Sequence, residues 1–474
     1  MSEIEVASEV EETLHHPKED DPSAAPYPSR IYSWYVVAVF VLAYTFSFID
    51  RQILSLLVEP MKRDLHISDT QIGLLVGLAF AIFYVFMGLP IGRLVDRRHR
   101  VSIIAFGVLF WSLMTALSGT AKVYWQLFAY RMGVGVGEAA LTPAAYSIIS
   151  DYFPPKRLGI AIGVYGIGVY IGAGLALVIG SIAIGWANSV GDLDLPIIGH
   201  VYSWQLVFFV VGLPGILIAI WVSTLREPVR RGHMRRETDA DGVTRDVAVP
   251  FSEVMAYLRA NGVAFLSMNI CFALLAMMAY GTAAWVPTFF VRTYGWSVGE
   301  IGRAYGLIIM VFGTLGVVSG GALGDYVCSK GYRNGRIIVM TLTGIVTLPF
   351  AVAFPLMDNP YYALALLAPA SFFATFTTGV GPSALMAMMP NQMRGFSSAL
   401  SGLIVNLIGL GLGPAAIAIV TDYVFGDEMM LRYSLAVVPP VVLLLGAGFG
   451  VLALKPYIKS LDYLDVWSSE NEKS

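Results

Sequence analysis

Long apolar segments alternate with short polar connections along almost the whole chain. Hydropathy predicts twelve such segments, and an apolar run of about 20 residues crosses a bilayer as a helix. The expected spans are 34–58, 71–92, 101–120, 124–149, 158–186, 204–225, 263–291, 299–322, 336–356, 361–388, 395–421 and 432–454. We therefore expect an all-α polytopic membrane protein with twelve transmembrane helices.

The distribution of basic residues orients these spans. Lysine and arginine concentrate in the connections that follow even-numbered spans, which predicts that both termini face the cytoplasm. The expected organisation is a disordered N-terminal tail 1–32, a six-helix half 33–225, a central cytoplasmic loop 226–262, a second six-helix half 263–456 and a cytoplasmic tail 457–474. The sequence has no Asn-x-Ser/Thr acceptor. This absence, together with short external loops, favours the plasma membrane of a bacterium (its inner membrane).

The amino-acid composition limits the classes of function to be expected. Of the 474 residues, 57% are hydrophobic and only 13% are charged, against about 25% charged residues in soluble proteins. The net charge of −3 and the lack of a basic domain give no reason to expect nucleic acid as a partner. No histidine lies in a predicted span, so neither a metal nor an organic cofactor is expected. No catalytic pattern occurs within the spans, so we do not expect an enzyme.

The two halves of the chain repeat each other. Gly92, Leu94 and Asp96 match Gly321, Leu323 and Asp325 at one constant offset of 229 residues. Ser68, Ile72, Gly73 and Gly77 match Ser297, Ile301, Gly302 and Gly306 at the same offset. Agreement of polar positions at one offset indicates two six-helix halves in parallel orientation. That arrangement is typical of transporters whose substrate binds near the midplane between the halves.

Four charged residues lie in the interiors of the first and fourth predicted spans. Asp50 and Arg51 are in the first span, and Arg131 and Glu138 are in the fourth. Each ionised group near the centre of a span costs roughly 2.5–3.5 kcal/mol on insertion scales, so such residues are usually functional. Arg131 and Glu138 are two helical turns apart and share a face. A buried ion pair that serves only packing remains the structural alternative.

These four charges sum to zero, which suggests a coupling scheme. If Asp50 or Glu138 takes up a proton, an arginine loses its counter-charge and can bind an anionic substrate. We expect Asp50 or Glu138 to carry the proton, and Arg51, Arg131 and Glu138 to line the substrate site. Protons are then the coupling ion.

The corresponding spans of the C-terminal half have no charged residue in their interiors. Phe272, Met278, Tyr280 and Phe376 are the expected contacts for an apolar part of the substrate. A cavity with one charged wall and one apolar wall suits an amphiphile. Aromatic and methionine stripes also occur in ordinary cores and on lipid-facing surfaces, and that alternative stays open.

Two sets of motifs carry a family resemblance. The loop Gly92-x-Leu94-x-Asp96-Arg97-x-x-Arg100 and its fainter copy at 321–325 resemble the signature loop of the major facilitator superfamily. Three further segments resemble the Spinster family of lysolipid transporters, and they are Phe48-Ile-Asp50-Arg51-Gln52, Arg131-Met-Gly133-Val-Gly135-Val-Gly137-Glu138-Ala139 and Asp151-Tyr-Phe153-Pro154-Pro155.

The resemblance implies a monomeric carrier that works by alternating access among membrane lipids and moves lysophospholipids or sphingosine-1-phosphate. It also implies that the Asp–Arg pair of the first span and the Arg and Glu of the fourth bind substrate and couple protons. We expect the signature loop to act as a conformational latch through Gly92, Asp96, Arg97 and Arg100, together with Asp151 at the end of span four and Asp325 in the copy of the loop. Asp96 would face a helix N-terminus, where the macrodipole favours an anion. Arg97 and Arg100 would reach Asp151 or lipid phosphates.

Other substrates fit parts of this pattern. Transporters of small organic anions such as hexuronates also carry charges on the first and fourth spans. Drug/H⁺ antiport ranks lower, because the fifth span lacks the proline of the antiporter signature. A lipid sensor on a transporter fold is a further alternative. The particular lysolipid, the direction and the proton stoichiometry are not determined by the sequence.

Overall fold

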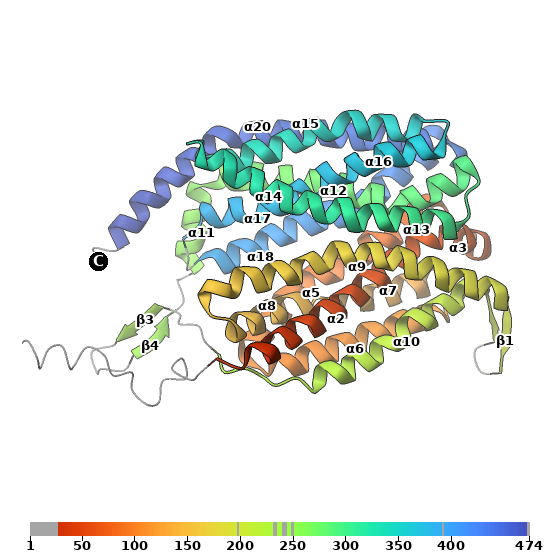
Figure 1. Ribbon diagram of the computed structural model, residues 1–474, viewed down its shortest axis with the longest axis horizontal. Coiled ribbons are helices and arrows are strands. Elements are labelled where there is room, and N and C mark those ends of the chain that lie inside the picture. The colour runs from red at the N-terminus through yellow and green to blue at the C-terminus, as the bar shows by residue number, and fades with distance from the viewer. Residues whose placement is uncertain are drawn as a thin grey trace, which may run out of the picture.

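The computed structural model describes residues 27–196, 199–230, 235–238, 244–247, 251–390 and 393–471. It is a bundle of helices that run along one common direction (Figure 1). Eleven helical stretches of the described chain are long and apolar enough to cross a membrane. The fourth expected span is instead divided into two shorter helices, Tyr124–Glu138 and Leu141–Tyr152. The predicted all-α, many-span architecture is confirmed.

The first half of the chain forms one group of helices and a small hairpin. Its elements are α2 (Arg30–Leu56), α3 (Val58–Leu65), α4 (Asp69–Val76), α5 (Leu78–Arg97), α6 (Arg100–Ser118), α7 (Tyr124–Glu138), α8 (Leu141–Tyr152), α9 (Pro155–Val190), β1 (Leu193–Leu195), β2 (Gly199–Val201) and α10 (Ser203–Ser223). Strands β1 and β2 pair antiparallel, with Leu193 opposite Val201.

The second half adds a further hairpin, a short helix and the remaining spans. Its elements are β3 (Arg235–Thr238), β4 (Thr244–Val247), α11 (Phe251–Ala260), α12 (Gly262–Tyr294), α13 (Val298–Ile308), η2 (Ile309–Gly313), α14 (Thr314–Ser329), α15 (Gly335–Leu356), α16 (Pro360–Ala374), α17 (Phe376–Ala387), α18 (Arg394–Val405), η4 (Asn406–Leu412), α19 (Gly413–Ile419), η5 (Val420–Phe425), η6 (Glu428–Met430) and α20 (Leu431–Asn471). Strands β3 and β4 are antiparallel. The segments η2, η4 and η5 are π-helical, so spans eight and eleven are locally widened.

The sequence repeat has a structural counterpart at the start of spans two and eight. Ser68 begins α4 with a capping box, in which its hydroxyl accepts from Gln71 N at 3.2 Å while Gln71 Oε1 accepts from Ser68 N at 2.9 Å. Ser297, one repeat later, begins α13 in the same way with Glu300. The capping box satisfies backbone donors that the first helical turn leaves free. The same local sequence therefore starts the same element in both halves.

The structure describes little of the expected N-terminal tail but most of the expected C-terminal tail. Residues 1–26 of the N-terminal tail and residues 231–234, 239–243 and 248–250 of the central loop lie outside the described residues. At the other terminus, α20 continues through residue 456 to Asn471. Arg333, before α15, contacts this extension through Asp462 at 2.5 Å and Asp465 at 3.0 Å. The part of the expected cytoplasmic tail that is described is thus helical.

The bundle has two distinct ends. Helix α2 begins and α20 finishes at one end, on the left of Figure 1, which we call the tail end. Helix α3 and the β1 hairpin lie at the opposite end, which we call the lock end.

The two halves approach most closely toward the lock end, where α4 packs on α19 and α9 packs on α13. A Cβ added to Gly73 would lie 2.9 Å from Ala415 Cα, and one added to Gly306 would lie 2.6 Å from Gly174 O. Glycine is needed at these positions because the facing backbones leave no room for a side chain.

The same helices have open space around their glycines nearer the tail end. Added Cβ atoms at Gly88 of α5 and at Gly159 and Gly163 of α9 would meet no described atom within 4 Å. The close glycine contacts between the two halves therefore lie toward the lock end.

Candidate functional site

An ion pair between α2 and α7 forms the centre of the site. Arg51 Nε and Nη2 each lie 2.6 Å from Glu138 Oε2. Ser47 Oγ donates to the same oxygen at 2.5 Å. Glu138 is buried, whereas the side chain of Arg51 is 13% exposed. The charges that the sequence predicts on spans one and four are thus brought together.

The glycine run of α7 makes this close approach possible. A Cβ on Gly135 would lie 2.5 Å from Phe80 O of α5, and a Cβ on Gly137 would lie 2.8 Å from Trp111 N of α6. Without side chains at these positions, α7 packs directly against two neighbouring backbones. Glu138 directly follows the last of these glycines, so it is buried where α7 packs against its neighbours.

Arg131 and Asp50 adjoin each other in a different way. Arg131 Nη1 donates to the backbone carbonyl oxygen of Asp50 at 3.1 Å. Both side chains are buried, at 1% and 2% exposure. Within the described chain, Arg131 Nε, Arg131 Nη2 and Asp50 Oδ1 have no hydrogen-bond partner. Because an unsatisfied buried polar group costs about 1–3 kcal/mol, these atoms are poised to accept a further partner.

Aromatic rings surround the Arg51 guanidinium. Its carbon lies 4.5 Å from the ring centre of Phe80 and 5.1 Å from those of Phe48 and Tyr84. Such cation–π contacts partly replace lost hydration. Sequence analysis missed this cage, although the spacing of Phe80 and Tyr84 by one helical turn on span two was a usable signal. Tyr44 of α2 and Tyr165 of α9 stack nearby, with ring centres 4.9 Å apart.

The predicted apolar contacts of the C-terminal half separate into two kinds. Phe272 and Tyr280 of α12 are half-buried, and Tyr280 packs against the core of the N-terminal half. Met278 and Phe376 are buried in the core of the C-terminal half. The Phe376 ring lies 5.0 Å from that of Phe372. Phe272 and Tyr280 are therefore the two with surface available for a ligand.

The residues of the expected latch make contacts within their own halves. Arg100 bonds to Asp151, as expected, and its Nε also lies 2.5 Å from Glu227 Oε1. Asp325 pairs with Arg336 at 2.9 Å. Gly92 has open space around it, and Arg97, the last residue of α5, is exposed. The side chain of Asp96 lies outside the described residues.

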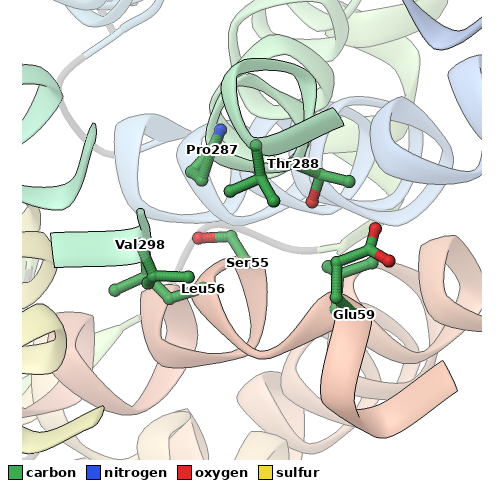
Figure 2. A pocket seen from close by; sticks show the side chains of 8 residues that line it. Ser55, Leu56, Glu59, Pro287, Thr288 and Val298 are labelled. Atoms are coloured by element: carbon green, nitrogen blue, oxygen red, sulfur yellow. The ribbon is translucent and has the colours of Figure 1, made fainter. Parts of the chain in front are cut away.

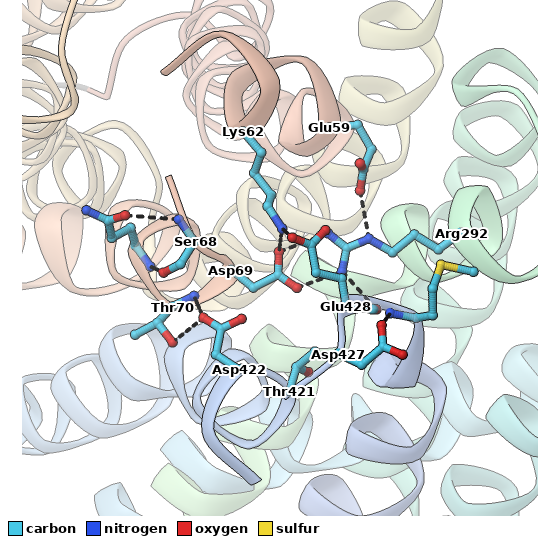
Figure 3. Close-up of polar contacts among 12 residues, drawn as sticks. Glu59, Lys62, Ser68, Asp69, Thr70, Arg292, Thr421, Asp422, Asp427 and Glu428 are labelled. Atoms are coloured by element: carbon cyan, nitrogen blue, oxygen red, sulfur yellow. Dashed lines mark hydrogen bonds and ion pairs between the residues drawn. The ribbon is translucent and has the colours of Figure 1, made fainter. Parts of the chain in front are cut away.

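A second charged cluster, missed by sequence analysis, joins the two halves at the lock end (Figure 3). We call it the lock, and it comprises Glu59, Lys62, Asp69, Arg292 and Glu428. Lys62 Nζ lies 2.6 Å from both Asp69 Oδ1 and Glu428 Oε1. Arg292 lies 2.6 Å from Asp69 Oδ2 and 2.7 Å from Glu59 Oε1.

A further bond lies beside the lock and also crosses between the halves. Asp422 Oδ2 accepts from both the backbone nitrogen and the hydroxyl of Thr70 at 2.7 Å, so it caps the N-terminus of α4. No local pattern in the sequence links these partners, because they are separated by hundreds of residues.

A small pocket lies directly beside the lock (Figure 2). It is enclosed by the end of α2, by α3, by the C-terminal part of α12 and by the start of α13, through Ser55, Leu56, Val58, Glu59, Pro287, Thr288, Val291 and Val298. Glu59 belongs to both the pocket and the lock.

Comparison with known proteins gives a consistent family. The model of the Major Facilitator Superfamily matches residues 40–414. An "MFS-type efflux pump" of Mycolicibacterium smegmatis is 30% identical over 402 residues, covering 83% of this chain and 86% of that protein. A "Probable galactarate/D-glucarate transporter GudP" of Bacillus subtilis is 25% identical, covering 83% of this chain and 87% of that protein.

A solved structure shows the same fold. It is a bacterial homologue of the human lysosomal transporter Spinster, in an inward-facing and unoccupied conformation. Its TM-score to this protein is 0.74 at 28% identity, and the match covers 91% of this chain and 99% of that one. The two repeated halves, the charged residues between them and these similarities together show that the chain is a multi-pass membrane protein that belongs to the Major Facilitator Superfamily of transporters and resembles Spinster.

Proposed function

We propose that the protein is a proton-linked secondary active transporter of lysolipids that works by alternating access. The observation that carries the proposal is the unequal pairing of the four buried charges. Glu138 is paired with Arg51 through Oε2, although its Oε1 has no partner, whereas Arg131 and Asp50 form no side-chain ion pair among the described contacts. This leaves one guanidinium for an anionic head group and one carboxyl for a proton.

Arg131 is the proposed head-group ligand. Its free Nε and Nη2 form one edge of a planar fork, the geometry that binds phosphate or carboxylate through two parallel hydrogen bonds. Arg51 adds positive charge to the same wall of the site and is partly exposed. Met278 and Phe376 support the apolar wall from within the core, while Phe272 and Tyr280 contact the alkyl chain.

Asp50 is the proposed proton carrier, with Glu138 as the ion-pair partner of Arg51. Asp50 forms no salt bridge among the described contacts, and a buried carboxylate without a directly bonded counter-ion costs several kcal/mol, a cost that a proton removes. Protonation of Asp50 leaves the charge of Arg131 unbalanced, so the site then attracts an anion. Proton binding and substrate binding therefore favour each other, which is the linkage that coupled transport needs.

The described conformation corresponds to one step of the transport cycle. We place the tail end in the cytoplasm of a bacterium, because basic residues concentrate in the connections at that end. The protein is then open to the inside and closed outside by the lock. Opening to the outside requires the lock to break and the tail end to close, where Asp96, Arg97 and Arg100 would act as the latch. The protein functions as a monomer in this scheme.

A second candidate substrate is a small organic anion. It is favoured by the similarity to a galactarate/D-glucarate transporter, and the fork of Arg131 fits a carboxylate as well as a phosphate. The apolar contacts of Phe272 and Tyr280 distinguish the two candidates, since a sugar acid has no alkyl chain to place there. The similarity to an "MFS-type efflux pump" is the reason to keep drug/H⁺ antiport as a third candidate.

The deciding experiment is flux of a fluorescent lysophospholipid across proteoliposomes, with and without a pH gradient. We expect gradient-stimulated flux in the wild type and gradient-independent flux in Asp50→Asn. Flux that ignores both the gradient and the substitution would leave the lipid as substrate but refute the coupling scheme. Uptake of D-glucarate without any lysolipid flux would instead establish the organic-anion alternative.

A further inference from the structure

A hydrogen bond near the middle of α9 joins the two halves away from the lock. The hydroxyl of Tyr170 on α9 donates to Thr378 Oγ1 on α17 at 2.9 Å, across 208 residues of chain. Tyr170 lies one helical turn from Gly174, toward the tail end, and Gly174 is the glycine whose carbonyl oxygen faces Gly306. The bond therefore lies beside a close backbone contact between the halves, on its tail-end side.

The ring of Tyr170 fits into a gap in span eight. A Cβ added to Gly313 would lie 2.8 Å from Tyr170 Cδ1, so a side chain there would displace the ring. Gly313 is the last residue of the π-helical segment η2, and such widened turns are frequent at functional sites. The carbonyl oxygen of Gly313 lies 3.1 Å from Thr375 Oγ1, at the residue where span ten is interrupted. Tyr170 thus contacts spans eight and ten at the same place.

Span ten is weakly held by its own backbone next to this bond. It is interrupted between α16 and α17, and the nitrogen of Thr378 bonds to the carbonyl oxygen of Thr375 at 3.1 Å, three residues earlier instead of four. Pro382, inside α17, has no N–H to offer to the carbonyl of Thr378. The first turn of α17 therefore depends on contacts with neighbouring helices, and the bond from Tyr170 is one of them.

The position of α17 affects the apolar wall of the substrate site. Phe376 begins α17, and its ring centre lies 5.0 Å from that of Phe372 and 5.5 Å from that of Phe373. Phe272 of α12 packs against the same helix, since a Cβ on Gly381 would lie 2.7 Å from Phe272 Cε1. A displacement of α17 would therefore move both the ring cluster and the surface on which Phe272 rests.

We propose that Tyr170 is a positioning residue that fixes the apolar wall of the substrate site while the halves are in the described conformation. The bond to Thr378 joins the halves, so it is lost when α9 moves away from α17. The wall is then free to shift about the break in span ten, and the affinity of the site for an alkyl chain changes with the conformation. A conformational change can be driven by a substrate only through such a difference in affinity. This inference rests on the proposed function, in which the alkyl chain of a lysolipid lies against that wall.

The experiment compares Tyr170→Phe, which keeps the ring beside Gly313 but loses the hydroxyl, with Thr378→Val, which loses the acceptor. Thr378→Ser keeps the acceptor and should behave as the wild type. Thr377→Val is the matched control, because it removes a buried hydroxyl one residue away that has no partner in the described chain. The double variant Tyr170→Phe/Thr378→Val shows whether the two hydroxyls act through one bond.

Two readouts are taken on the full-length protein in liposomes. The first is the KM for fluorescent lysophospholipids with a long and with a short alkyl chain. The second is the distance between spin labels at positions 160 on α9 and 386 on α17, both exposed. The label distance requires no substrate, so it tests the position of α17 independently of lysolipid transport.

We expect Tyr170→Phe and Thr378→Val each to raise the KM for the long-chain lipid about three- to tenfold, the equivalent of one neutral hydrogen bond. The effect on the short-chain lipid should be smaller, because less of its chain reaches the wall. The double variant should show no larger effect than either single variant, since both remove the same bond. All three should broaden the distribution of label distances, whereas Thr377→Val should leave it unchanged.

A wild-type KM and wild-type label distances in Tyr170→Phe would overturn the proposal. So would additive effects in the double variant, an equal rise in KM for both chain lengths, or an effect of Thr377→Val as large as that of Thr378→Val. Absence of lysolipid flux in the wild type would refute the proposed function, and the label distances would then still decide whether Tyr170 positions α17.

Discussion

Arg292 and Asp69 form a two-bonded ion pair that joins the two halves of the protein at the lock end. Nη1 of Arg292 lies 2.6 Å from Oδ2 of Asp69, and Nη2 lies 2.8 Å from Oδ1. The side chain of Asp69 has no exposed surface, and that of Arg292 is 5% exposed. Parallel paired bonds fix direction as well as distance. The pair therefore holds the end of α12 against the start of α4 only when the lock end is closed.

Loss of this pair should shift the conformational equilibrium. Removing one partner of a buried, hydrogen-bonded charge pair costs about 2–5 kcal/mol. Only the conformation with a closed lock end contains the pair, so only that conformation is destabilised. We expect Arg292→Gln to favour the opposite conformation by at least about tenfold. Spin labels at positions 160 on α9 and 326 on α14, both exposed, should report a shorter distance as the tail end closes.

Arg63→Gln is the control for the lock. Arg63 also belongs to α3, but its pair is with the adjacent Asp64 at 2.7 Å, and its side chain is 68% exposed. An exposed pair contributes little, so the label distances should not change. If Arg292→Gln and Arg63→Gln gave the same distances as the wild type, the lock would have no conformational role.

Alanine substitutions at two glycines of span two should differ in their effect on the described conformation. A Cβ on Gly77 would lie 2.6 Å from Gly411 O, whereas a Cβ on Gly88 would meet no described atom within 4 Å. Gly77→Ala should therefore disfavour closure at the lock end. Gly88→Ala should leave the described conformation intact and gain up to about 1 kcal/mol of helix stability. The same label distances test both, and similar behaviour of the two variants would contradict the packing argument.

A substitution at Arg131 can test whether substrate binding needs the planar shape of the guanidinium or only its positive charge. Arg131→Lys keeps the positive charge but loses the planar fork whose Nε and Nη2 are available. We expect the KM for an anionic substrate to rise about tenfold or more, the equivalent of one charge-assisted hydrogen bond. Arg93→Lys, at an exposed position of α5, is the control. A KM that stays at the wild-type value would remove Arg131 from the head-group site.

The two buried carboxylates should differ in their effect on stability. Glu138→Gln leaves Arg51 without its counter-charge, and breaking a buried pair in this way costs about 3 kcal/mol. Asp50→Asn removes a carboxyl whose Oδ1 has no partner within the described chain, so it should cost less. Thermal unfolding of the two variants tests this order.

The double variant Arg51→Gln/Glu138→Gln completes this comparison. It should recover part of the stability lost in Glu138→Gln, because neither member of the pair is then left charged. A larger loss in Asp50→Asn than in Glu138→Gln would reverse the assignment of the two carboxylates.

The sequence alone determined the elements of this protein and most of its central charges. Local hydropathy sets the spans. The helix-starting segment at Ser68 recurs at Ser297, and this repeat can be seen directly in the sequence. The presence of Asp50 and Glu138 inside spans also stood out, because burying a charge in a bilayer is expensive at any position. These are properties of a segment and its solvent, so they can be deduced without knowing which helices touch.

Only the tertiary structure decided which groups pair. Arg51 bonds Glu138, Arg131 bonds a backbone oxygen, and Arg292 reaches Asp69 across 223 residues of chain. Each outcome depends on which helical faces meet and at what depth. Those relationships arise from the packing of whole helices through glycines such as Gly135 and Gly306, and from the closed or open state of the halves. The pattern of the sequence contains the lock residues but does not show them paired.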